Sequence, residues 1–274
     1  MNNIAKQKKI RALDVLIERG FASTVKEARA IIMEWRFIVG GKPVKKPGDT
    51  ISPGSDLKVI PARQYVSRGG LKIEGIFEDL GLEASGKTAV DIGASTGGFT
   101  DFLLQNGARS VIAIDVGYGL LSWNLRNSEK VEVMEKTNIR YLAPEDLEFK
   151  AEIAVVDVSF ISIKKFFKKI LKITSEDTKI LLLLKPQFEL KSKYVKHKGV
   201  VKESNFHFIA LKDMVDFLNS FQVSIKNIRF SCIKGSSGNI EFWIYLRKSI
   251  NPNESKLNYD KMINDAVFKA HEYF

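Results

Sequence analysis

The sequence predicts an α/β protein whose larger part is an open, mostly parallel sheet covered by helices on both faces. Three observations support this prediction. Strand-like and helix-like segments alternate over residues 67–250, which is typical of such sheets. Hydrophobic residues make up 45% of the 274 residues, enough for a sizeable core. The glycine-rich stretch Asp91–Asp101 joins an apolar run to a helical pattern, where α/β sheets bind cofactors.

Residues 1–60 are predicted to form a separate small α+β domain, and residues 61–66 a linker. Apolar residues recur at helical spacing in two successive helices: Leu13, Leu16 and Ile17, then Ala28, Ile31 and Ile32. Gly20 ends the first helix, and a capping-box pattern at Ser23–Glu27 begins the second. Short strands and turns are expected from Phe37 to Gly48.

The larger domain, residues 67–250, is expected to alternate strands with helices. Its predicted strands are 88–92, 111–115, 132–134, 153–157, 179–185, 224–230 and 240–246, and its predicted helices are 69–80, 98–106, 121–127, 162–173 and 205–219. The run Ile180–Leu184 is apolar throughout, as in a strand buried on both faces, whereas 240–246 alternates. In the C-terminal extension, 251–274, residues 259–273 have the pattern of an amphipathic helix.

The segment 162–173 combines lysines with large apolar residues and could be mistaken for a membrane-binding helix. Its apolar positions are Ile163, Phe166, Phe167, Ile170 and Leu171. These positions also suit a helix that packs on a sheet, and the strand before it requires a covering helix. We therefore interpret the segment as part of the core.

The net charge of +11 is unevenly distributed, because residues 1–60 hold 12 Lys and Arg against 6 Asp and Glu. A basic module beside a nearly balanced domain favours a polyanionic partner, although a solvated lysine-rich surface has the same composition. No apolar run approaches the roughly 20 residues of a membrane span, and no secretion signal follows the basic N-terminus. The single cysteine, Cys232, excludes an intramolecular disulfide and a zinc cluster. We expect a cytoplasmic protein without a membrane partner or metal.

The glycine spacing in Asp91–Asp101 indicates the kind of cofactor. Gly93-x-x-x-Gly97-Gly98 matches neither the dinucleotide fingerprint nor the P-loop. Asp91 stands where a pyrophosphate would meet like charge, so a cofactor with an ammonium group and no phosphate fits better. S-adenosylmethionine is such a cofactor. Asp115, at the end of the next predicted strand, suits the ribose hydroxyls. The alternative is a tight turn with incidental acids.

Six motifs in order resemble the TlyA family, often labelled hemolysin A, of ribosomal RNA 2′-O-methyltransferases, and the catalytic half resembles the FtsJ/RrmJ group. The motifs are Val66–Lys72, Asp91–Asp101, Asp115–Gly119, Asp157–Ser162, Leu182–Glu189 and Gly235–Glu241. The resemblance spans residues 10–247 and implies a Rossmann-like S-adenosylmethionine-dependent methyltransferase sheet. It departs from the family in the linker, where many members have Arg-x-Trp-Val and this chain has Arg63-Gln-Tyr-Val66.

The resemblance implies a set of site residues. The catalytic tetrad falls on Lys72, Asp157, Lys185 and Glu241. The cofactor positions are Asp91, Gly93, Ser95, Gly97, Gly98, Phe99, Asp115 and Asn138. The N-terminal domain resembles the small RNA-binding module first known from a ribosomal protein of the small subunit, through Arg11–Asp14, Glu27–Arg29, Val39–Val44 and Lys46–Gly48. Its RNA contacts would fall on Arg11, Lys26, Arg29 and Lys42, each of which could equally be a plain surface charge.

The tetrad suits methyl transfer to a ribose. A 2′-hydroxyl is a poor nucleophile, and a lysine can take its proton or stabilise the forming alkoxide. Asp157 and Lys185 stand at predicted strand ends, on the edge where open sheets place ligands. We expect Lys185 beside the attacking oxygen, Asp157 orienting it, and Lys72 and Glu241 holding the ribose and the lysine. Taken singly, each could be a surface lysine, a turn cap or an outward-facing acid.

Together with the glycine turn, the resemblance implies an S-adenosylmethionine-dependent enzyme that methylates a cytidine 2′-hydroxyl in ribosomal RNA or ribosomal subunits, as the family does. A non-catalytic RNA-binding or ribosome-assembly protein is an alternative, which the complete tetrad disfavours. The pore-forming toxin implied by the other family name is disfavoured, because no membrane-inserting segment is present. The sequence carries no signal for an oligomeric state.

Overall fold

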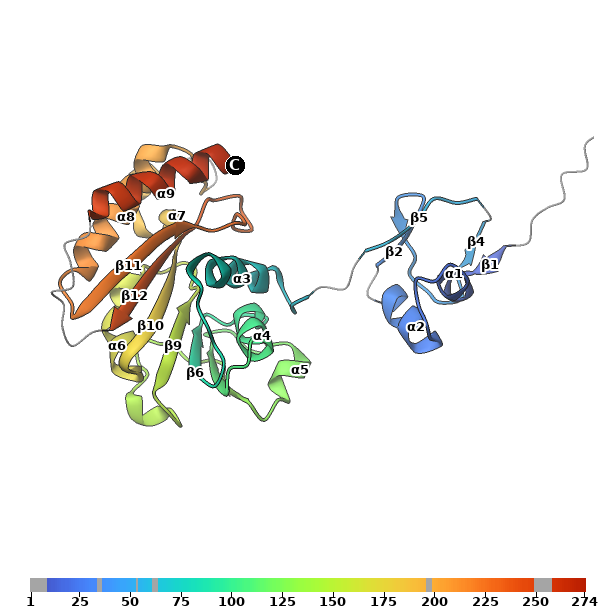
Figure 1. Cartoon of the computed structure of the whole chain (residues 1–274), viewed down its shortest axis with the longest axis horizontal. Coiled ribbons are helices and arrows are strands. Elements are labelled where there is room, and N and C mark those ends of the chain that lie inside the picture. The colour runs from blue at the N-terminus through green and yellow to red at the C-terminus, as the bar shows by residue number, and fades with distance from the viewer. Residues whose placement is uncertain (1–8, 34–35, 53, 61–63, 196–198, 249–257) are drawn as a thin grey trace, which may run out of the picture. The chain divides into compact units, whose positions relative to one another are not determined.

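The chain divides into two compact units, residues 1–64 and 65–274. The computed structural model describes residues 9–33, 36–52, 54–60, 64–195, 199–248 and 258–274. Figure 1 shows the elements of each unit.

The smaller unit is α+β, as predicted. Its elements are β1 (Ile10–Arg11), α1 (Ala12–Glu18), α2 (Val25–Met33), β2 (Phe37–Val39), β3 (Lys42–Pro43), β4 (Thr50–Ile51) and β5 (Leu57–Val59). Strand β2 pairs with β3 and β5, and β1 pairs with β4. The hydroxyl of Thr24 accepts from the Glu27 amide (3.2 Å), and the Glu27 carboxylate accepts from the Ser23 amide (2.8 Å). Helix α2 is thus capped by residues of the predicted segment, with the return bond from Glu27 going to the residue before the cap, Ser23, rather than to Thr24.

The larger unit contains a seven-stranded sheet in the order β11-β12-β10-β9-β6-β7-β8. Its strands are β6 (Thr88–Ile92), β7 (Ser110–Ile114), β8 (Val131–Met134), β9 (Ala151–Val156), β10 (Thr174–Leu184), β11 (Val223–Phe230) and β12 (Phe242–Lys248). Within this sheet β12 alone runs against its neighbours. The predicted mostly parallel α/β sheet is confirmed.

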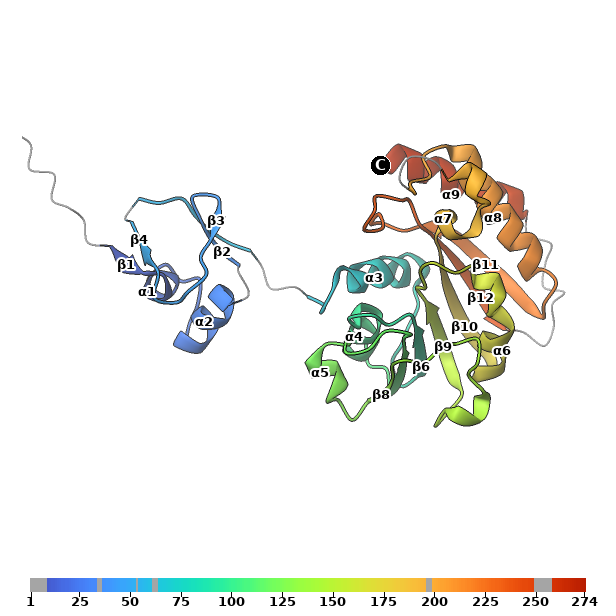
Figure 2. The same ribbon diagram turned by 180° about the vertical axis from the view of Figure 1, so that it is seen from behind.

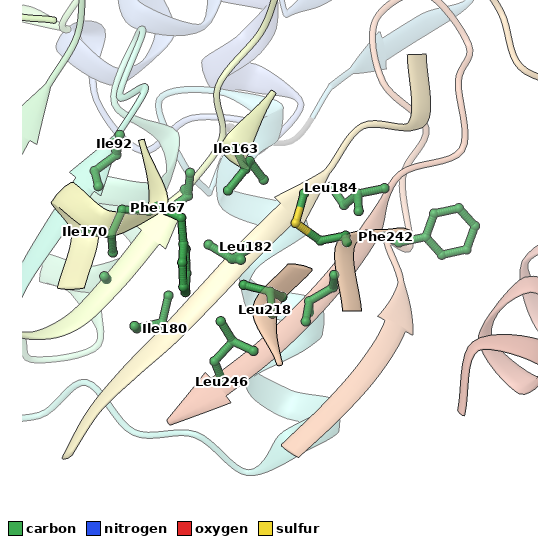
Figure 3. Packing of buried hydrophobic residues seen from close by; sticks show 14 of the residues in the cluster. Ile92, Ile163, Phe167, Ile170, Ile180, Leu182, Leu184, Leu218, Phe242 and Leu246 are labelled. Carbon is green, nitrogen blue, oxygen red and sulfur yellow. The ribbon is translucent and has the colours of Figure 1, made fainter. Parts of the chain in front are cut away.

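Helices cover both faces of this sheet (Figures 1 and 2). They are α3 (Arg68–Leu80), α4 (Gly98–Gln105), α5 (Trp123–Arg126), α6 (Phe167–Ile173), α7 (Pro186–Glu189), α8 (Ser204–Leu218) and α9 (Tyr259–Tyr273). The apolar run of β10 serves both faces: Ile180, Leu182 and Leu184 pack in the cluster of α6, α8 and α9, while Leu181 and Leu183 pack with α3 and α4. Figure 3 shows Phe167, Ile170 and Leu218 beside the first of these sets.

Two predicted elements of the larger unit differ from the structure by more than two residues at an end. The helix expected at 162–173 is divided into a 3₁₀ turn, Ile163–Lys165, and α6. The helical path is interrupted at Phe166, whose φ of −137° is not helical. The start of the segment is held separately by Glu189, whose carboxylate accepts hydrogen bonds from the Ser162 hydroxyl (2.5 Å) and the Ile163 amide (2.9 Å). Strand β10 begins at Thr174 rather than 179, with an irregularity in its register before Lys179.

The predicted linker, 61–66, is too long at its C-terminal end. Tyr65 is buried against Phe102, with ring centroids 5.7 Å apart, and the Val66 amide donates to Asp101 (2.7 Å). Both residues therefore belong to the larger unit, while 61–63 lie outside the described residues.

The predicted C-terminal extension, 251–274, is not an appendage. Helix α9 buries Ile263 and Ala270 in the same core as α8, because its apolar face completes the cover of the sheet. Residues 251–257 lie outside the described part of the chain.

Candidate active site

Two adjoining cavities open at the carboxyl edge of the parallel strands. The first, here called the tetrad cavity, measures about 240 Å³, and the second, the turn cavity, about 570 Å³. Gly93, Ser95 and Asp157 line both. This is the edge at which open α/β sheets hold their ligands.

The four predicted tetrad residues come from four elements and meet in the tetrad cavity. Lys72 lies on α3, Asp157 follows β9, Lys185 follows β10, and Glu241 precedes β12. They form two ion pairs of 2.6 Å each, between Lys72 Nζ and Glu241 Oε2 and between Lys185 Nζ and Asp157 Oδ1. Lys185 Nζ also donates to Ser159 Oγ (2.8 Å).

The pairs lie in a largely desolvated place. The side chain of Glu241 is 3% exposed and that of Lys185 is 10% exposed. Burial raises the pKa of Glu241, and the adjacent Lys72 ammonium opposes this rise. Each lysine is therefore paired with a carboxylate in a place that is largely shielded from bulk water.

The glycine turn brings the ends of β6 and β9 close together. Gly93 has a φ of +89°, and a Cβ atom there would lie only 2.5 Å from the carbonyl oxygen of Asp157. Only glycine allows this approach. Asp115 fixes the neighbouring loops, because its carboxylate accepts from the amides of Ser95 (2.8 Å) and Gly117 (2.7 Å).

Most of the predicted cofactor residues reach a cavity wall. Gly98 and Phe99 line the tetrad cavity, Asp115 and Asn138 line the turn cavity, and Gly93 and Ser95 line both. Gly97 lines neither. Its lack of a Cβ atom instead leaves room for Leu121 and Leu125, because a Cβ atom would stand 2.4 Å from a methyl carbon of Leu125.

Asp91 also lines neither cavity. Its side chain is buried beneath the start of α4, where Oδ2 accepts from the amide (3.0 Å) and the hydroxyl (2.7 Å) of Thr100. Its Oδ1 is buried without a hydrogen-bond partner. Burial raises the pKa of Asp91 to about 7, against the lowering effect of the Thr100 hydroxyl. In this structure Asp91 supports the glycine turn from behind.

Sequence reasoning missed several residues of the cavity walls. Arg68, Lys234 and Ser236 line the tetrad cavity, and Ser159 and Phe160 line the turn cavity. Phe160 is 91% exposed and has a φ of +66°, a strained conformation for a bulky residue. The signal lay within or beside the motifs, since Ser159 and Phe160 belong to Asp157–Ser162 and Lys234 precedes Gly235.

Comparison with known proteins agrees with this architecture. The family model of FtsJ-like methyltransferases matches residues 65–248, and the S4 domain model matches residues 11–57. The chain is 36% identical over 260 residues to the Mycobacterium tuberculosis 16S/23S rRNA (cytidine-2′-O)-methyltransferase TlyA, covering 93% of this chain and 94% of that one. The chain belongs to the TlyA family of FtsJ-like methyltransferases. The predicted resemblance is confirmed, and the protein is a methyltransferase.

Two further relatives match this chain over almost its whole length. A candidate rRNA methyltransferase of Bacillus subtilis, YqxC, is 39% identical over 268 residues, which are 97% of this chain and 95% of that one. The solved structure of a candidate hemolysin from Streptococcus thermophilus has a TM-score of 0.75 and 37% identity, and the match covers 97% of both chains.

The predicted RNA contacts of this TlyA-family protein all lie in the S4 domain. Arg11 is in β1, Lys26 and Arg29 are on α2, and Lys42 is in β3, and all four are exposed. Arg11 is held by Asp14, with Nε and Oδ2 2.7 Å apart. Within the described residues, no helix is long and apolar enough to cross a membrane, and no group of three or more His, Cys, Asp and Glu side chains could hold a metal ion.

Proposed function

We propose that this enzyme transfers a methyl group from S-adenosylmethionine to the 2′-hydroxyl of a cytidine in ribosomal RNA. The observation that carries the proposal is the pair of buried ion pairs, Lys72–Glu241 and Lys185–Asp157, in a cavity that shares its wall with the glycine turn. The names of the TlyA relatives support the cytidine 2′-hydroxyl as acceptor.

The turn cavity fits S-adenosylmethionine. It has an acid at the end of β7, Asp115, for ribose hydroxyls, and Asn138 on the neighbouring loop. Gly93 lines the wall that this cavity shares with the tetrad cavity and lets the ends of β6 and β9 lie close together there. The bound cofactor would supply a methyl group already activated by the sulfonium, so the chain's own residues mainly position the acceptor.

The tetrad handles the proton and the orientation of the ribose. Lys185 in its neutral form takes the proton of the 2′-hydroxyl at Nζ. The resulting ammonium is stabilised by Asp157 at 2.6 Å and by the Ser159 hydroxyl at 2.8 Å. Lys72, held by Glu241, donates to the ribose and keeps its hydroxyl directed at the methyl group. Because Asp157 and Ser159 already stand at hydrogen-bonding distance from Lys185 Nζ, little reorganisation is needed when Lys185 takes up the proton.

The S4 domain is proposed to bind the RNA, with Arg11, Lys26, Arg29 and Lys42 contacting phosphates. The exposed positions of all four residues and the excess of Lys and Arg in residues 1–60 support this role. The catalytic domain is then residues 65–248 together with α9, which shares its core.

The proposal is tested with purified protein, labelled S-adenosylmethionine and ribosomal subunits that lack the modification. We expect label to reach a cytidine 2′-oxygen and Lys185→Ala to lower the rate by roughly 10²- to 10⁴-fold, the usual range for loss of a general base. Lys87→Ala is the matched control, because Lys87 also pairs with a carboxylate (Glu152, 2.9 Å) but lies outside both cavities.

The results also separate the alternative readings. Label on a base atom, or full activity in Lys185→Ala, would contradict the proposed chemistry. No transfer by the wild-type enzyme, combined with tight RNA binding, would favour a non-catalytic role in ribosome assembly.

A further inference from the structure

The cations that line the tetrad cavity differ in how they are paired. Lys72 and Lys185 each have a carboxylate at 2.6 Å. Arg68 and Lys234 line the same cavity, and neither forms an ion pair with any carboxylate of the described residues. Two uncompensated cations beside a ribose site match the phosphates of an RNA backbone.

Lys234 lies on the loop between β11 and β12, and this loop is fixed from inside the site. The Ser231 amide donates to the Glu241 carbonyl (2.8 Å), and an Arg68 guanidinium nitrogen donates to the Lys234 carbonyl (3.4 Å). A Cβ atom on Gly235 would lie 2.4 Å from the Glu241 carboxylate. The loop that carries Lys234 therefore rests directly on a tetrad residue.

The same loop is held from outside by the end of α9. The Lys234 ammonium lies 4.6 Å from the ring centroid of Phe274. Phe274 packs edge-on against Tyr273 (4.9 Å) and Phe230 (6.1 Å), and Tyr273 also contacts Phe230 (5.4 Å). In Figures 1 and 2 the end of α9 lies beside the tip of this loop.

The position of this aromatic group is set by the core. Ile263 and Ala270 of α9 are fully buried, so the helix presents its last turn at a fixed place. An ammonium on the face of an aromatic ring is attracted to it, while its other side stays open to an anion. The ring thus holds the ammonium in place and leaves its positive charge available, whereas a carboxylate would neutralise it.

We propose that Lys234 binds a backbone phosphate next to the reacting nucleotide, and that Phe274 is a positioning residue that holds the Lys234 ammonium at the cavity wall. This inference rests on the proposed function, because it takes RNA as the acceptor. It gives α9, far from the tetrad in sequence, a part in binding the substrate.

The test measures steady-state methylation of ribosomal RNA over a range of salt concentrations with the full-length enzyme. Lys234→Gln should raise the KM for RNA and reduce the slope of log KM against log salt by about one. Phe274→Leu keeps an apolar side chain but removes the ring face, and should raise the KM by about two- to fivefold. In both variants the kcat and the affinity for S-adenosylmethionine should stay within about twofold of wild type.

Two comparisons separate positioning from a general structural effect. The double variant Lys234→Gln/Phe274→Leu should have the same KM as Lys234→Gln alone, because Phe274 acts through Lys234. Phe268→Leu, another exposed aromatic of α9 (63% exposed), should leave the KM and the salt slope unchanged.

The inference is overturned if both single variants have the wild-type KM and salt slope, if their effects simply add, or if Phe268→Leu acts like Phe274→Leu. A drop in kcat and cofactor affinity together would instead assign Phe274 to folding of the loop, and would also overturn it. A wild-type enzyme that methylates no RNA contradicts the proposed function itself, which is a different outcome.

Discussion

At the scale of single residues, the tetrad is built from charges that are compensated locally. Lys185 and Asp157 stand at the ends of adjacent strands, whereas Lys72 and Glu241 are joined across 169 residues of sequence. A buried ion pair costs desolvation energy that good geometry only partly offsets. Its retention in a cavity wall is therefore better explained by chemistry on a bound ligand than by stability.

Asp91 gives a prediction about stability and pH. Its pKa is about 7 in the folded protein and ordinarily 3.8, so the folded state binds its proton more tightly. Asp91 therefore contributes roughly 4 kcal/mol to the free energy of unfolding below about pH 4, and this contribution is lost as the pH rises to about 7. Asp91→Asn removes this loss, because an amide does not titrate. Its NH2 group would stand at the Oδ1 position, which has no hydrogen-bond partner, and the cost of burying it is the same at every pH. Urea unfolding of both proteins at pH 4.5 and pH 8 measures the difference.

As the pH rises from 4.5 to 8, we expect the free energy of unfolding of Asp91→Asn to increase relative to that of the wild type. Asp216→Asn is the control, because that carboxylate is 57% exposed and its replacement should give a nearly constant difference. A relative stability of Asp91→Asn that does not change with pH would show that Asp91 is ionised throughout.

At the scale of elements, the strands and the meeting of Asp157 with Lys185 were predictable from sequence, because parallel strands end at one edge. Lys72, on a helix, and Glu241, before the antiparallel β12, were placed in the site only by the family resemblance. The burial of the Asp91 side chain beneath α4 was not predicted, although the alternation of side chains along β6 implies it. Ala89 packs with α3 and α4, while Val90 and Ile92 pack on the opposite face. Asp91 therefore points under α4 rather than along the strand into the cavity.

The position of Lys234 depends on α9 and Phe274, and contacts so distant in sequence leave no local pattern.

The glycine turn gives a prediction at this scale. In Gly93→Ala the new methyl group would meet the Asp157 carbonyl at 2.5 Å, so the ends of β6 and β9 must separate. We expect the affinity for S-adenosylmethionine to fall by at least about tenfold and the stability by roughly 1–3 kcal/mol. Isothermal titration and thermal unfolding measure the two effects.

Gly86→Ala is the matched control for that variant. Gly86 also has a positive φ, +69°, but open space around it, and it lies outside both cavities. It should lose about 1 kcal/mol of stability and keep its cofactor affinity. Equal cofactor affinities in the two variants would show that the close approach at Gly93 does not shape the cofactor site.

At the scale of the whole molecule, the chain is two units with separate cores. Among the described residues, the hydrophobic cluster of the smaller unit runs from Ala12 to Ile51 and contains no residue of the larger one. The three clusters of the larger unit lie between Tyr65 and Ala270. Each unit therefore has its own source of hydrophobic stabilisation.

This division predicts that a fragment of residues 65–274 folds and binds S-adenosylmethionine with unchanged affinity, since both cavities are lined by its own residues. Its affinity for ribosomal RNA should fall by at least about tenfold and depend less steeply on salt, because the basic S4 domain is missing. Filter binding at several salt concentrations measures this.

In the full-length chain, Lys26→Gln/Arg29→Gln should reproduce part of the loss without altering cofactor affinity. A fragment that fails to bind cofactor would contradict the independence of the units, whereas unchanged RNA affinity would contradict the role of the S4 domain.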